Sequence, residues 1–267
     1  MVELLDLIIV GAISMFMGAI TSMSGLNLGR FTVVAHVESS VPASVGTAIG
    51  ITAMVTVTSV LAYLKSNYIH RKAFLTMTAT GVVGCIVSSF FTVLLPSILI
   101  LAMVAAIMAW SIYRIASSKS AKHSKQSVAP FDRKQYAKQY AIGMITGSLS
   151  GLIGIIFGSL VLGALVNVVK SDPKMLVGTT LALSAILSIC GVAAHLAHGN
   201  MNFVLLGIMG SAGMIGGVIG SRFSTSMAPR KLKMLLIACQ AGTLVYLAYM
   251  ITLAVLRPAV IHCNSCF

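Results

Sequence analysis

The sequence predicts an all-α protein, a polytopic transmembrane helical bundle built from two repeats. Of its 267 residues, 58% are hydrophobic and only 9% are charged, and the mean hydropathy is +1.00, whereas roughly a quarter of the residues of a soluble domain carry charge. Such a chain has too few polar side chains to cover a surface in water. We therefore expect a multi-pass protein of the cell membrane, the inner membrane in a bacterium.

Six apolar runs have the length of about 20 residues that a helix needs to cross about 30 Å of hydrocarbon. They cover 44–64, 73–95, 97–116, 175–197, 201–221 and 232–256. Two further runs, 4–37 and 140–169, are too long for one ordinary span and are rich in Gly and Ser. The first of these opens with acidic rather than basic residues, so we expect no removable signal peptide.

A basic polar stretch divides the chain nearly in half. It predicts a first transmembrane repeat at 1–116, a cytoplasmic linker at 117–139, a second repeat at 140–256 and a tail at 257–267. Several positions of the first half recur in the second. Asn67, Gly84, Phe90 and Pro96 return 133 positions later as Asn200, Gly217, Phe223 and Pro229, and Val45-Gly46-Thr47 returns as Val177-Gly178-Thr179. This ordered series indicates an internal duplication.

The distribution of Lys and Arg predicts how the halves are oriented. If each Gly-rich run is a single span, the basic residues divide poorly between the two sides. If each run enters and returns as a hairpin, all 18 Lys and Arg except Arg30 and Arg257 fall on the inner side, opposite Glu3, Asp6 and Glu38, as the positive-inside rule requires. A hairpin plus three spans makes an odd number of crossings, so we expect two inverted repeats, each with a Gly-rich broken helix or hairpin plus three transmembrane helices.

The Gly-rich breaks are the candidate binding site. Non-helical backbone at membrane depth must line a cavity within the protein, and helix N-termini at such breaks favour an anion. A charge such as that of Arg30 is costly there and marks function by default, and snorkelling to the interface is the alternative interpretation of this residue. The substrate-binding residues expected from the breaks and the matched threonines are Ser24, Gly25, Asn27, Gly29, Arg30, Thr47, Ser150, Gly151, Gly154, Gly158 and Thr179.

Simpler interpretations compete for some of these positions. A threonine at the start of a span is commonly a helix cap, which is the favoured interpretation of Thr47 and Thr179. Asn67 and Asn200 are interpreted as turn residues. Close helix packing is the expected role of the glycines inside the spans, namely Gly18, Gly81, Gly84, Gly213, Gly217 and Gly220.

The same segments resemble the sulfite exporter family TauE/SafE, membrane permeases for sulfur-containing and organic anions. The matching pieces begin at Ser24-Gly25-Leu26, Ser44-Val45-Gly46, Ser150-Gly151-Leu152 and Leu176-Val177-Gly178, and the similarity extends over about residues 5–255. The consecutive glycines of the family are replaced here by Arg30-Phe31 and Ile155-Ile156-Phe157. The resemblance implies export or facilitated movement of sulfite, a sulfonate or a related small anion, with proton coupling left open.

Three alternatives remain. An intramembrane hydrolase is disfavoured because GSLSG at 147–151 fits no nucleophile motif and no HExxH occurs, so no catalytic residues are expected. A cation or metal transporter needs carboxylates at membrane depth, but all five acidic residues lie at ends, in loops or in the linker. A structural membrane protein needs no broken helices. We expect a small anionic substrate and membrane lipid as partners, no nucleic acid, no metal and no cofactor, and leave a homodimer open.

The inverted topology predicts that both termini lie outside the cell. Alkaline phosphatase fused after Phe267 is expected to be active, because it folds only outside, whereas the same reporter inserted in the 117–139 linker is expected to be inactive. A C-terminal fusion that is active only as a cytoplasmic reporter would contradict the hairpin topology.

Overall fold

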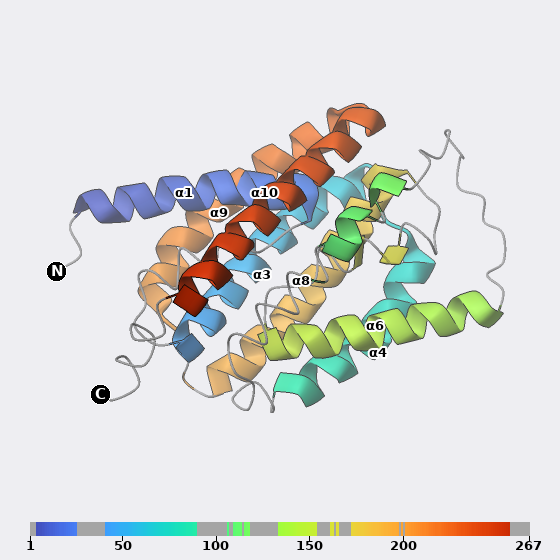
Figure 1. Ribbon diagram of the computed structural model, residues 1–267, viewed down its shortest axis with the longest axis horizontal. Coiled ribbons are helices and arrows are strands. Elements are labelled where there is room, and N and C mark those ends of the chain that lie inside the picture. The colour runs from blue at the N-terminus through green and yellow to red at the C-terminus, as the bar shows by residue number, and fades with distance from the viewer. Residues whose placement is uncertain are drawn as a thin grey trace.

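The computed structural model is a bundle of long helices (Figure 1). It describes residues 4–25, 41–89, 133–153, 172–197 and 201–256, together with 106, 109–113, 115–117, 161–162, 164–165 and 199. Within these residues no strand is present. The helices are α1 (Leu4–Ser24), α3 (Val41–Lys65), α4 (Arg71–Ser89), α6 (Arg133–Ile153), α8 (Pro173–Ala197), α9 (Phe203–Ser226) and α10 (Pro229–Leu256).

Several helices have the length and apolar composition of membrane spans. Three meet both criteria over Gly46–Lys65, Pro173–Ala197 and Phe203–Ser226, and a shorter apolar helix covers Ile8–Ser24. Large apolar side chains such as Phe16, Leu61 and Phe223 are more than half exposed on the outside of the bundle. An exposed apolar surface of this kind is suited to lipid, and the predicted all-α, multi-pass architecture is confirmed.

Helices α3 and α8 form an antiparallel pair inside the bundle. A Cβ atom placed on Gly178, near the start of α8, would meet Tyr63 near the end of α3, and one placed on Gly191 would meet Ile49 near the start of α3. Figure 1 shows the two helices side by side in opposite directions. Both are 25 residues long, and they occupy corresponding places in the two halves of the chain.

Each half packs its first helix against a helix of the other half. The two most extensive interfaces join α1 to α9 and α6 to α4. In the first, Gly18 lies against the backbone of Gly213; in the second, Gly147 lies against the backbone of Gly81. Since glycine alone allows backbones to approach this closely, the packing role predicted for the span glycines is confirmed.

The helix boundaries relate the two halves by 132 positions. Helix α3 ends at Lys65 and α8 ends at Ala197, while α4 begins at Arg71 and α9 at Phe203. Helices α3 and α8 are each followed by a residue with positive φ, namely Asn67 (φ 55°) after α3 and Gly199 (φ 68°) after α8. The sequence match of Asn67 with Asn200 is thus one position away from the structural match, and Asn200 itself lies outside the described residues. Asn67 is confirmed as a turn residue.

The directions of the helices fit a chain that enters and returns. Contacts of Met15, Ala19 and Ser22 with successive glycines of α9 make α1 parallel to α9, and α9 is in turn parallel to α3. The start of α3 therefore lies at the end of the bundle where α1 begins. Helices α4, α6 and α8 run the other way.

Two details of the predicted segments differ in the structure. Helix α1 continues through Ser22-Met23-Ser24, and α6 continues through Gly147 to Ile153, so neither predicted break starts where the glycines and serines do. In α6 the reason is packing, because Gly147 is needed at the contact with Gly81. Helix α6 also begins at Arg133, within the range predicted as linker.

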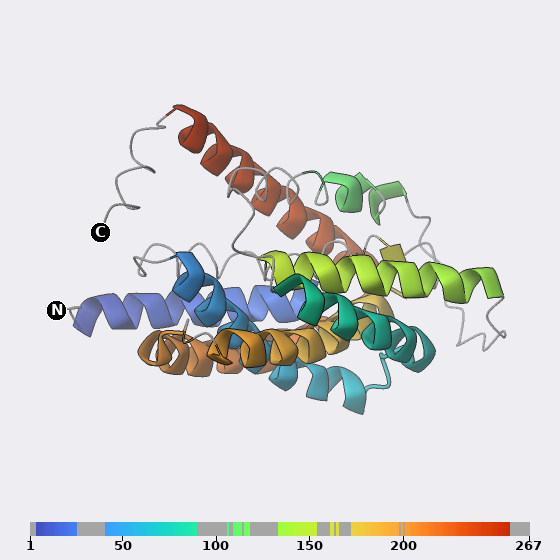
Figure 2. The same cartoon turned by 90° about the horizontal axis from the view of Figure 1, so that it is seen from below.

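Helix α10 leaves the plane of the other helices at an angle (Figure 2, red). It contacts the short helical pieces around residues 109–117. The Gln240 Nε2 atom donates to Ser111 Oγ at 3.2 Å, and Lys233 Nζ donates to the Ala116 carbonyl at 3.5 Å.

Two glycines of α9 provide a matched test of the interhelical packing. A Cβ at Gly216 would collide with the Met15 carbonyl of α1, whereas one at Gly207 would meet nothing within 4 Å. We expect Gly216→Ala to lower the stability by about 1–3 kcal/mol through overpacking. Gly207→Ala should be neutral or slightly stabilising, because alanine is the better helix former. Thermal unfolding in detergent measures both, and equal midpoints for the two variants would contradict the packing.

Candidate functional site

The end of α1 lies against the side of α8. The Gly25 backbone has a φ of +72°, and its N–H donates to the Thr21 carbonyl at 2.6 Å. The preceding Ser24 is buried, and its hydroxyl donates to the Ile20 carbonyl at 2.7 Å. A Cβ placed on Gly25 would lie 3.4 Å from the Thr180 methyl group. The first candidate segment therefore ends directly at α8.

A row of unpartnered hydroxyls begins at this point of α8. Thr180, Ser184 and Ser188 are 0%, 0% and 1% exposed. None of the three hydroxyl oxygens has a hydrogen-bond partner. Residues four apart lie on one face of a helix, so the three form a continuous row from the end of α1 along α8. A buried hydroxyl without a partner costs about 1–3 kcal/mol.

Several other hydroxyls of the described bundle bond to their own helix, although Thr78 and Thr146 are, like the row, without a partner. Thr179 donates to the Met175 carbonyl at 2.7 Å, and Thr56 donates to the Thr52 carbonyl at 2.7 Å. This back-bonding is the ordinary way in which Ser and Thr are satisfied in membrane helices. Thr180, Ser184 and Ser188 retain their donors for another partner.

The matched threonines connect the two halves. The Thr47 hydroxyl accepts a hydrogen bond from the Asn202 N–H at 2.9 Å, and the Thr179 hydroxyl accepts one from the His70 N–H at 2.9 Å. Both threonines are buried and lie well inside their helices. The prediction that they cap their own helices is therefore wrong, because each one binds the residue that precedes a helix of the opposite half.

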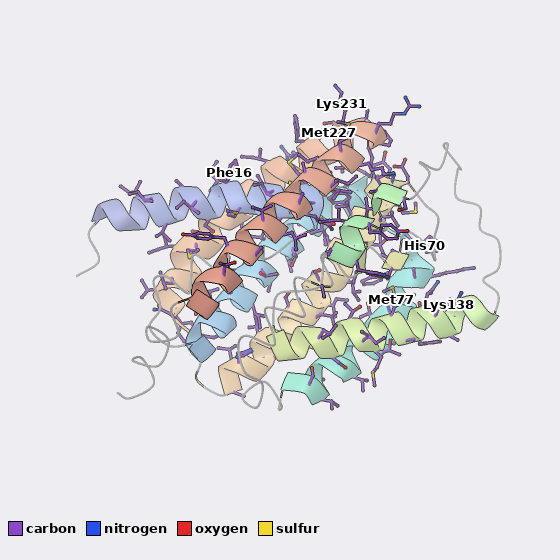
Figure 3. The ribbon with its side chains drawn as sticks, viewed as in Figure 1. Phe16, His70, Met77, Lys138, Met227 and Lys231 are labelled. Carbon is purple, nitrogen blue, oxygen red and sulfur yellow. The ribbon has the colours of Figure 1, made fainter. Side chains whose placement is uncertain are left out.

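The residues held by these threonines are themselves helix caps. The Asn202 Oδ1 atom accepts from the Val204 and Leu205 N–H groups, and the His70 Nδ1 atom accepts from the Ala73 N–H at 3.2 Å. His70, labelled in Figure 3, lies at the start of α4. Burial lowers its pKa below the ordinary value and the charge of Lys72 lowers it further, although a backbone hydrogen bond opposes them. The cap needs the neutral imidazole, because the Nδ1 atom of His70 must be unprotonated to accept the hydrogen bond from the Ala73 N–H.

Basic residues surround the end of the bundle at which α1, α3 and α9 finish. Lys174 is 8% exposed; its ammonium donates to the Thr225 carbonyl at 2.6 Å and lies 5.4 Å from the centre of the Tyr68 ring. The Tyr63 hydroxyl bonds with the Ser22 carbonyl (3.0 Å) and with Ser224 Oγ (2.7 Å). No carboxylate of the described residues pairs with the Lys174 ammonium, so this buried cation favours an anion nearby.

The predicted site residues are only partly brought together. Gly25, directly after Ser24, meets α8 at Thr180, and Thr47 and Thr179 form hydrogen bonds across the interface between the halves. Ser150 and Gly151 are helical residues of α6 whose side-chain environment is not described. The other predicted site residues lie outside the described residues, namely Asn27, Gly29, Arg30, Gly154 and Gly158.

Four residues that matter here were missed from the sequence. Thr180, Ser184 and Ser188 are common residues in an apolar helix, and only their spacing of four gives a signal. The cap residue Asn202 lies two positions after Asn200, and the repeat pattern singled out Asn200 instead. In the described part of the chain, no group of three or more His, Cys, Asp or Glu is placed to hold a metal ion.

The bundle defines a multi-pass membrane protein, and its polar row on α8 is the candidate binding site. The family model "Sulfite exporter TauE/SafE" matches residues 8–247, so the chain belongs to the TauE/SafE family of membrane transporters. A curated relative, the "Probable membrane transporter protein YunE" of Bacillus subtilis (strain 168), is 28% identical over 106 residues, which is 38% of this chain and 39% of the relative. No solved structure gives a significant match.

The His70 cap predicts a pH-dependent stability. The pKa of His70 in the folded chain is below its ordinary value, so the unfolded chain takes up the proton first as the pH falls, and stability declines as the pH falls below about 6.5, the ordinary pKa of histidine. His70→Asn should reduce this decline, since asparagine caps without titrating, as Asn202 does in the other half. Thermal midpoints across this pH range measure it, with His195→Asn as the control. Equal pH slopes for wild type and His70→Asn would contradict the role.

Proposed function

We propose that this chain moves a small oxyanion, sulfite or an organosulfonate, across the membrane by alternating access between two inverted repeats. The observation that carries the proposal is the buried row of free hydroxyls at Thr180, Ser184 and Ser188, next to the end of α1. Each hydroxyl can donate one hydrogen bond. Because residues four apart in a helix are about 6 Å apart along its axis, the row offers successive donors to a small sulfur oxyanion that moves along α8. Family membership supports transport rather than catalysis.

Electrostatics supports an anion over a cation. The described end of α8 carries Lys174 and the positive end of the helix dipole, with the hydroxyl row beginning at Thr180, further along the same helix. A cation would instead need carboxylates or carbonyl oxygens close to the row. Among the described residues the nearest carboxylate along α8 is Asp172, whose Oδ1 atom accepts from the Lys174 backbone N–H at 3.3 Å.

The arrangement of the halves supports alternating access. Helices α3 and α8 occupy corresponding positions and pack antiparallel, as expected for repeats of opposite orientation. One hydrogen bond runs from the Asn202 N–H to the Thr47 hydroxyl and the other from the His70 N–H to the Thr179 hydroxyl, so the two bonds occupy corresponding positions in the two halves. A conformational change that swaps the roles of the two halves would then convert one open state into the other.

The experiment is flux into proteoliposomes. We expect uptake of labelled sulfite or a sulfonate above that of empty vesicles, with sulfate and simple carboxylates compared in parallel, and with and without a pH gradient to detect proton coupling. Thr180→Val and Ser184→Ala should each lower the flux at low substrate concentration about tenfold, because a hydrogen bond to a charged group contributes about 1.5–3 kcal/mol.

The matched control is Thr252→Val, since this exposed threonine of α10 donates only to the Ala248 carbonyl of its own helix. It should leave the flux unchanged. Transport equal to that of empty vesicles for every anion would refute the function. If Thr180→Val and Ser184→Ala leave transport unchanged, the substrate site is not on α8, although the transport function itself is not contradicted.

A further inference from the structure

A groove between the last turns of α3 and α9 is separate from the hydroxyl row. It encloses about 330 Å³ and is lined by four residues from one face of α3, by four from one face of α9 and by Ser66 after α3. On α3 the face runs from Thr58 to Lys65, and on α9 it runs from Val218 to Thr225. The volume is at the lower end of the range of small-ligand sites.

The groove has a charged end and an apolar end. Lys65 is the last residue of α3, and Arg222 lies one turn before the end of α9, so both cations are located toward the end of the bundle. Leu61, Ala62 and Val218 line the groove on the side toward the middle of the helices. No carboxylate lines it, and neither cation forms an ion pair with any described residue.

The groove opens toward lipid rather than toward the centre of the bundle. Its rims carry Leu61 (55% exposed) and Leu64 (52%) on α3, and Ile219 (52%) and Phe223 (57%) on α9. Cations at the ends of membrane helices commonly reach for the interface without a specific partner. Here, however, two of them flank a preformed apolar groove that continues into the hydrocarbon region.

We propose that this groove binds one anionic phospholipid, with its phosphate between Lys65 and Arg222 and an acyl chain along Leu61 and Val218. Two unpaired cations complement the phosphate, and basic pockets between transmembrane helices are suited to acidic headgroups. The hydroxyl of Ser66, which also lines the groove, adds a donor for the headgroup oxygens, whereas the Ser221 and Thr225 hydroxyls donate to carbonyls of their own helix. The apolar part of the groove favours a lipid over a free inorganic anion, because only the lipid has an acyl chain that can be buried there.

Occupancy of this groove would join the ends of α3 and α9. Tyr63 on α3 already bonds with Ser224 on α9 and with the end of α1. A lipid phosphate between Lys65 and Arg222 would add a second bridge between the same two helices, two residues away on each helix. The bound lipid would thus stabilise the end of the bundle at which α1 terminates.

Native mass spectrometry of the full chain tests the proposal. Dioleoyl phosphatidylglycerol and dioleoyl phosphatidylcholine are each titrated into the detergent-solubilised protein, and the Kd of the first bound lipid is measured. We expect phosphatidylglycerol to bind more tightly. Lys65→Gln/Arg222→Gln should raise its Kd about 25-fold, since each cation near a lipid headgroup contributes about fivefold.

Three variants separate this site from general charge and from misfolding. Lys72→Gln/Arg230→Gln removes two exposed cations that do not line the groove and should change the Kd less than about twofold. Lys65→Arg/Arg222→Lys keeps both charges and should bind nearly as wild type. Ala62→Phe fills the groove without changing charge and should weaken the first lipid as the double Gln variant does.

Several outcomes would overturn the proposal. Equal affinity for the two lipids would remove the headgroup recognition, and equal loss in the Lys72/Arg230 control would make the effect one of diffuse charge. Displacement of the lipid by inorganic phosphate would assign the cations to a free anion. A lipid-free dimer that protects the groove would assign it to a second copy of the chain. None of these measurements depends on transport, so they stand apart from the flux experiment.

Discussion

The rest of this structure depends on one constraint, which is that the first helix of each half packs against a helix of the other half. The first helix of each half has its main interface with the other half, through glycines whose backbones touch, Gly18 with Gly213 and Gly147 with Gly81. In lipid there is little hydrophobic gain from joining helices, so close packing and hydrogen bonds must hold them. Neither half can satisfy these contacts alone, and we infer that the two fold as one unit. The same packing brings the end of α1 to α8, and with it the candidate site.

The hydrogen bonds of Thr47 and Thr179 repeat this logic with polar atoms. A backbone N–H at the start of a helix has no partner within its own helix, and leaving it unpaired inside a membrane protein is costly. The N–H groups of Asn202 and His70, just before α9 and α4, are satisfied by threonines of the opposite half. Because both bonds cross the interface, sliding one half past the other would break them together. They define a fixed register between the two halves.

The sequence predicted the bundle, the duplication and the packing glycines, because apolar length and small-residue spacing are local properties. It did not predict which helices pack against the other half, since nothing in the spacing of Gly147 distinguishes a helix contact from a break. The threonines were recognised as matched, yet their partners lie 155 and 109 positions away. The hydroxyl row was missed for a different reason. Whether a serine in a membrane helix bonds its own backbone or remains free depends on its rotamer and neighbours, and residue type does not reveal either.

The halves are alike in architecture but differ in the donors that they offer. In the register of 132 positions, the row Thr180, Ser184 and Ser188 of α8 corresponds to Ala48, Thr52 and Thr56 of α3. Ala48 has no hydroxyl, and Thr56 bonds to its own helix, so α3 does not reproduce the α8 row. Under the alternating access proposed above, exchange of the two conformations would leave the anion on α8 while the scaffold moves around it. A substrate held by one half throughout such a cycle would need no transfer between equivalent sites, so in this proposal the symmetry of the fold serves the motion and its asymmetry serves the binding.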